Sequence, residues 1–164
     1  MTRDKDFKAL VRSRMRRHNE SYTTARAALL VGPPSEDRRW RAARREQQLI
    51  VARWFDDDQL RALPARRKIR AAVLLEVLSH FVPGSDYPES QVSRRLRRIH
   101  PDFACLRREL VGLGYLERSA SVYWVCRTPP VRTELERREL PAWEAIWLPA
   151  FVAGGTDRID REAS

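Results

Sequence analysis

The most distinctive chemistry in the sequence comes from closely spaced basic side chains. They form a central group and three smaller ones: Arg94, Arg95, Arg97 and Arg98; Arg66, Arg67 and Lys68; Arg107 and Arg108; and Arg118. A guanidinium presents a planar fork of donors that matches phosphate, and neighbouring cations repel one another unless anions neutralise them. We therefore predict a nucleic-acid-binding surface, in which Arg108 contacts a base and Arg107 a phosphate.

The same side chains have a simpler explanation as solvated or ion-paired residues. The central group can pair with Glu76, Glu109 or Glu117. Basic residues in the first turn of a helix oppose its dipole, so the group at 66–68 needs an outside anion. That anion is either a phosphate or the acidic run at 56–58, and the sequence favours neither.

No residue pattern indicates catalysis or metal binding. His18, His80 and His100 are far apart in sequence, and Cys105 and Cys126 form no CxxC pair, which argues against zinc. The GxSxG, P-loop, GxGxxG and HExxH patterns do not occur. We expect a protein that is not an enzyme, with no catalytic residues, no cofactor and no metal.

Bulk charge supports an anionic partner. The chain has 32 basic and 22 acidic residues, a net charge of +10 and a pI near 10.7. A pI above about 9 is typical of phosphate-binding domains. A genomic bias toward arginine is the alternative, because only three of the basic residues are lysines. Two cysteines, no signal core and no apolar run of roughly 20 residues predict a cytoplasmic protein without membrane contact.

Apolar periodicity predicts a winged helix-turn-helix core over residues 56–127. A short extended segment is expected at 60–63, before Pro64. The other predicted elements are helices over 65–81, 88–99 and 102–113, and strands over 115–118 and 122–126. Pro88 suits a first helical turn, and Asp102 can cap the third helix. The predicted fold class is mainly α with a small β-hairpin (α+β).

Additional helices are predicted on the N-terminal side of this core. Residues 1–31 form a basic helical hairpin with a turn at 18–20, and 35–55 form a connecting amphipathic helix. We consider residues 36–55 a candidate contact for a homodimer.

A Pro- and Trp-containing extension over 128–164 follows the core, with short helices at 131–139 and 142–148 and disorder after about 154. Its five basic and seven acidic side chains exclude it from a phosphate-binding surface. Trp143, Trp147 and Phe151 are too apolar for a free tail. We expect them to pack on the core, with binding of a protein partner as the alternative.

Several segments together resemble the DUF2087 family. They are Pro64 to Lys68, His100 to Val111, Gly114 to Leu116, and Tyr123-Trp124. The resemblance covers about residues 53–126, under half of the chain. It implies a winged-helix-like bacterial module, often joined to regulatory DNA-binding segments, and it implies fold more than function. Residues 6–15 and 20–26 are similar to a short helical element that begins many actinobacterial proteins, where a glycine often replaces Asn19.

These features predict a DNA-binding transcriptional regulator that contacts mainly the phosphate backbone. An RNA- or ribosome-associated factor and a protein-interaction adaptor are the alternatives. We expect DNA in preference to RNA as the partner.

Overall fold

The computed structural model describes residues 36–154 and, in the N-terminal segment, positions 8–9, 11–13, 15–16, 21–23 and 25–26. The chain divides into two compact units, 1–41 and 42–164. Nearly all described positions before residue 27 are helical, as expected for both predicted N-terminal helices, and Val11 and Ala25 are buried. The predicted turn at 18–20 and the tail after 154 lie outside the described residues.

Helix α3 (Glu36–Trp54) matches the predicted connecting helix. Its buried side includes Ala43 and Gln47. The Gln47 side-chain amide donates a hydrogen bond of 2.7 Å to the carbonyl oxygen of Ala72, and this bond ties α3 to the next helix of the core.

A tight hairpin replaces the predicted extended segment at 60–63. Strand β1 (Phe55–Asp56) pairs with β2 (Gln59–Leu60). Phe55 and Leu60 lie opposite each other and are both buried, which fixes the register. Asp57 adopts a positive φ of 52°, a conformation that aspartate tolerates in turns. The prediction of an extended segment was therefore wrong at this position.

Three helices build the core, in the predicted order. They are α4 (Arg67–Leu78), α5 (Glu89–Ile99) and α6 (Phe103–Gly112). Helix α4 is buried along most of its length, whereas α5 buries one stripe, Val92, Leu96 and Ile99. The Asp102 side chain accepts a hydrogen bond from the backbone N–H of Cys105, so the predicted cap is confirmed.

Helix α4 is shorter than the predicted 65–81. Arg66 is extended, and the Ser79 hydroxyl donates to the carbonyl of Glu76 where the helix ends. Phe81 is still buried, although it lies in the loop that follows. Because Phe81 is apolar and buried like the residues of the helix, the apolar pattern predicted a helix end three residues too late.

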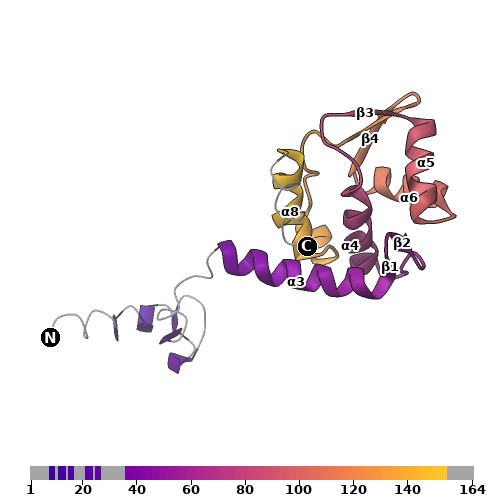
Figure 1. Cartoon of the computed structure of the whole chain (residues 1–164). Coiled ribbons are helices and arrows are strands. Elements are labelled where there is room, and N and C mark those ends of the chain that lie inside the picture. Colours follow the sequence, from indigo (N-terminus) through magenta and orange to yellow (C-terminus); the bar gives the residue numbers. More distant parts are fainter. Residues whose placement is uncertain are drawn as a thin grey trace. The chain divides into compact units, whose positions relative to one another are not determined.

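A three-stranded antiparallel sheet completes the core (Figure 1). Strands β4 (Leu116–Ser119) and β5 (Val122–Val125) form the predicted hairpin. The sequence did not predict β3 (Asp86–Pro88), which pairs with the other side of β5 and gives the order β3-β5-β4. Mainly helical structure with small antiparallel sheets confirms the α+β class.

The C-terminal extension packs on this core. It contains α7 (Glu134–Arg138) and α8 (Ala142–Val152), and α8 contacts α4. Trp143, Trp147 and Phe151 are at most 7% exposed, and the Trp147 and Phe151 rings stack at 4.3 Å between centroids. Their predicted packing is confirmed. Their burial does not support the alternative role in partner binding.

A buried polar network joins the extension to the core. Glu144 accepts hydrogen bonds from the Tyr115 hydroxyl and from Arg132, whose Nε lies 2.8 Å from its carboxylate. Arg132 also donates to the carbonyl of Leu113. Burial, and then the charge of Glu144, raise the pKa of Tyr115 above its usual range.

The two free cysteines differ in accessibility. Cys126 is buried, and this burial raises its pKa to about 11, whereas Cys105 is half-buried. Because the thiolate is the reactive form, we expect iodoacetamide at pH 8 to modify Cys105 at least tenfold faster than Cys126. Mass spectrometry of timed samples would measure both rates, and equal rates would contradict the prediction.

Candidate functional site

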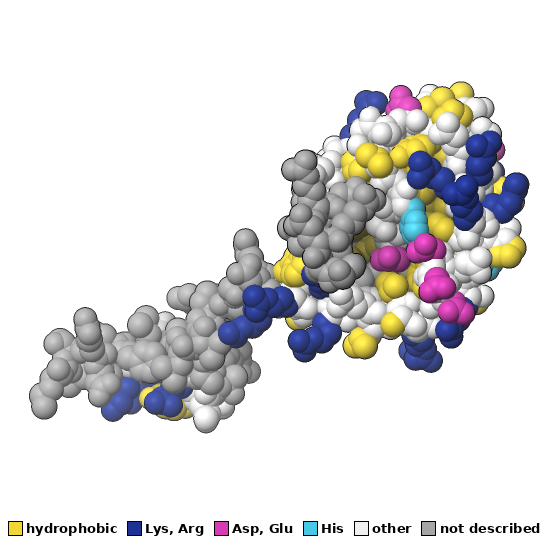
Figure 2. All heavy atoms as spheres, in the orientation of Figure 1, with side chains coloured by type: hydrophobic (Ala, Val, Ile, Leu, Met, Phe, Trp, Pro, Cys, Tyr) yellow, Lys and Arg dark blue, Asp and Glu magenta, His cyan; other side chains and the backbone are white. Residues whose placement is uncertain are grey.

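One face of α5 carries three exposed guanidinium groups. Gln91, Arg94, Arg95 and Arg98 follow the i, i+3, i+4, i+7 spacing of a single helix face, beside the buried stripe. Together they line a shallow groove of about 350 Å³. Figure 2 shows basic side chains gathered over α5. We call these four residues the α5 groove.

Arg95 is held in place by its surroundings. Its guanidinium donates a hydrogen bond of 3.0 Å to the carbonyl oxygen of His80 and lies 5.0 Å from the centroid of the Tyr87 ring. Tyr87 packs edge-on against Phe81, and its hydroxyl accepts from the backbone N–H of Val82. A guanidinium has five donors, so Arg95 keeps several for a ligand while its orientation is fixed.

The other α5 arginines behave in two ways. Arg94 and Arg98 are exposed and form no ion pair with any described residue. Arg97 lies on the other side of the helix, with its guanidinium 4.6 Å from the centroid of the Phe103 ring. Of the four arginines predicted around Leu96, three therefore line the groove and one does not.

Arg107 is engaged within the fold. It lies 2.8 Å from the carboxylate of Glu89 and 3.1 Å from the hydroxyl of Ser93, both on α5. The predicted phosphate contact for Arg107 is therefore not supported. The residue instead links α6 to α5, a contact that sequence spacing could not reveal because Glu89 is 18 positions away.

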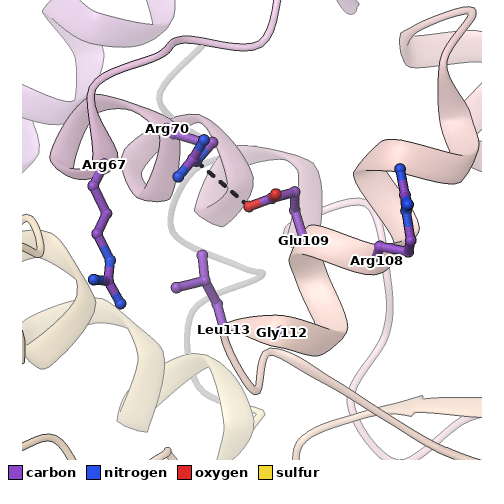
Figure 3. A pocket seen from close by; sticks show the side chains of 6 residues that line it. All are labelled: Arg67, Arg70, Arg108, Glu109, Gly112 and Leu113. Carbon is purple, nitrogen blue, oxygen red and sulfur yellow. Dashed lines mark ion pairs between the residues drawn. The ribbon is translucent and has the colours of Figure 1, made fainter.

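A second hollow of about 530 Å³ lies between α4 and α6 (Figure 3). Arg70 pairs with Glu109 at 3.4 Å across it, and Arg67 pairs with Glu139 at 2.7 Å. Arg108 also lines the hollow, but its side chain points away from Arg67 and Arg70 (Figure 3). These guanidiniums do not converge, and carboxylates already neutralise two of them.

The two basic regions lie at opposite ends of α4. Arg67 begins this helix, whereas His80, which holds Arg95, follows its last turn. The prediction that the arginines of the second and third predicted helices converge on one open face is not supported, because Arg107 pairs with Glu89 and Arg108 lines the hollow between α4 and α6. Of the predicted nucleic-acid-binding surface, the α5 groove is the part that the structure leaves as a candidate.

The remaining predicted contacts are dispersed. Lys68 lies 4.0 Å from Glu46 and forms no described ion pair with the acidic run at 56–58, the partner that the sequence suggested. Arg66 is exposed in an extended conformation just before α4. Arg118 on β4 donates to the hydroxyl of Tyr123.

Residues 59–125 match the DUF2087 family. The family is described as an uncharacterized protein conserved in bacteria. The match confirms the resemblance seen in the sequence and covers the core from β2 to β5, under half of the chain. No curated protein and no solved structure matches the chain.

The α5 groove lies wholly inside the DUF2087 segment, whereas Arg132 and Glu144 of the buried network lie outside it. Sequence reasoning missed Gln91 in the groove, although its spacing from Arg94 and Arg95 was a usable signal. It could not have found the carbonyl of His80, because that contact depends on the loop after α4.

Other kinds of site receive no support in the described part of the chain. There, no group of three His, Cys, Asp or Glu residues could hold a metal ion. No described helix combines the length and apolar character that crossing a bilayer requires.

Proposed function

We propose that the DUF2087 segment is a winged-helix module that binds nucleic acid, DNA in preference to RNA, through phosphate contacts of α5. The observation that carries this proposal is the α5 groove, in which three arginines and one amide share an accessible face without a carboxylate among them. The element order α4-β3-α5-α6-β4-β5, with β3 and the β4–β5 hairpin in one sheet, supports the winged-helix assignment.

The state of the three arginines favours phosphate as their ligand. Arg94 and Arg98 have no described carboxylate partner to displace, and Arg95 is already oriented by Tyr87 and His80. Charge-assisted hydrogen bonds from guanidinium to phosphate are strong and frequently bidentate. The net charge of +10 adds long-range attraction to a polyanion.

The contacts are expected to position the nucleic acid more than to read its sequence. A base-reading helix in the major groove presents several long polar side chains to base edges. Helix α6 is poorly equipped for that, because Arg107 is occupied and Arg108 is its one exposed long side chain. We therefore propose backbone-dominated binding with weak sequence preference.

The test is a titration of a fluorescein-labelled mixed-sequence 20-base-pair duplex, followed by anisotropy at several salt concentrations. We expect R94A/R98A to weaken binding by roughly 10- to 100-fold near 100 mM salt and to reduce the slope of log K against log salt by about 2. The matched control is R137A/R138A on α7, which removes the same charge from another exposed helix. We expect it to bind nearly as the wild type does.

Two results would contradict the proposal. One is no binding of the wild type at micromolar protein. The other is equal weakening by both double variants, which would indicate an effect of bulk charge and not of the groove.

RNA remains the second candidate ligand. The preference for DNA rests on the winged-helix order of elements, since phosphate contacts alone discriminate poorly between the two nucleic acids. The same groove would then bind structured RNA. Crosslinking in cells followed by sequencing would separate the two ligands. Recovery of ribosomal RNA would support RNA binding, and recovery of chromosomal DNA would support DNA binding.

A further inference from the structure

The face that carries the α5 groove also carries an acidic patch. Asp56, Asp57 and Asp58 are all exposed on the β1–β2 hairpin, and this hairpin packs against α5. Figure 2 shows basic side chains over α5 and acidic side chains toward the hairpin on the same face. We call these three residues the acidic turn.

His80 shows that the acidic turn and the groove lie within electrostatic reach of each other. Burial lowers the pKa of His80, Asp58 raises it and Arg95 lowers it further. Asp58 and Arg95 therefore both act on the same imidazole. The charge of Asp58 therefore reaches the residue whose carbonyl holds Arg95, and screening of such charges is weaker at lower salt.

The acidic turn has no described ion pair that would neutralise it. None of its three carboxylates forms a salt bridge with a described residue, in contrast to Glu89, Glu109 and Glu139. Its conformation does not require the charge either. Asp57 has a positive φ, which asparagine adopts at least as readily. The fold would therefore tolerate a neutral turn.

We propose that the acidic turn is an electrostatic boundary that limits where a polyanion can lie on α5. Repulsion from the turn excludes phosphates from the hairpin side of the groove, so the nucleic-acid backbone crosses α5 on the side away from β1–β2. The turn thus keeps binding weaker and the contact shorter than the arginines alone would allow. This inference rests on the proposed function of the groove.

The test neutralises the boundary and measures a gain of affinity. In the 20-base-pair titration at 50 mM salt, we expect D57N/D58N to tighten binding by about threefold to tenfold, from screened Coulomb repulsion of a few phosphates. D58K should tighten binding further and steepen the salt dependence by about one phosphate contact, because the boundary then becomes an attachment point.

The matched control is E134Q/E139Q, which changes the net charge equally. Glu139 pairs with Arg67 at the other end of α4, and Glu134 lies on α7, so both are remote from the groove. We expect the control to change affinity by less than twofold. Thermal denaturation of each variant would verify that the fold is retained.

The outcomes separate the two proposals. If R94A/R98A weakens binding but D57N/D58N leaves it unchanged, or if the control tightens it equally, the boundary is overturned and the proposed function stands. If the wild type does not bind, both are overturned.

Discussion

Replacing Glu144 by alanine is expected to lower the free energy of unfolding by about 3–5 kcal/mol, because it leaves the buried guanidinium of Arg132 without a counter-charge. The side chains of Arg132 and Glu144 are only 13% and 8% exposed. The Tyr115 hydroxyl would also lose its acceptor. Urea denaturation followed by circular dichroism would measure the change.

An exposed pair of the same type provides the control. Arg138 and Glu134 are separated by the same 2.8 Å but are 74% and 83% exposed. Solvent-exposed pairs contribute roughly 0–1 kcal/mol, so we expect E134A to cost less than 1 kcal/mol. If E134A and E144A lowered the free energy of unfolding by similar amounts, the buried Arg132–Glu144 pair would stabilise the fold no more than an exposed pair does.

A chain that ends at residue 128 is expected not to fold. Truncation removes the side chains of Trp143, Trp147, Leu148 and Phe151, which α8 buries. At about 1.5–3 kcal/mol each, their loss amounts to about 6–12 kcal/mol, comparable with the whole stability of a typical domain. The truncated chain would show no cooperative urea transition and a collapsed amide NMR dispersion.

Point variants make this prediction independent of truncation. Trp147→Ala should cost about 3–5 kcal/mol, as large-to-small changes in a core do. Leu135→Ala on α7 should stay within about 0.5 kcal/mol, because Leu135 is 68% exposed. A cooperative transition in the truncated chain would show that the DUF2087 segment folds without the extension.

Local signals predicted the elements whose cause is local. Asp102 caps α6, as expected, because capping acts within one turn. Pro88 was predicted in the first turn of α5, but it ends β3 and lies just before the helix, because its strand pairs with β5. Gly114 ends the α6 region with a φ of +77°. A Cβ there would lie 3.0 Å from Pro130, so the close approach of the extension also requires glycine.

Features that depend on distant partners were missed. Strand β3 spans three residues and exists because β5, more than 30 positions later, pairs with it. Arg107 has the same local character as Arg108, yet only Arg107 meets Glu89 and Ser93. The sequence therefore predicted which arginines were candidates for the site. It could not predict which of them remain accessible, because tertiary contacts determine that.

The attachment of the first turn of α5 has a mechanical consequence. The backbone N–H of Glu89 donates to the carbonyl of Ser121 in the β4–β5 turn, and its carboxylate binds Arg107 on α6. Strand β3 also continues directly into α5. These contacts attach the first turn of α5 to the sheet, to the tip of the β4–β5 hairpin and to α6, so we expect a displacement of this end of the helix to displace the hairpin tip with it.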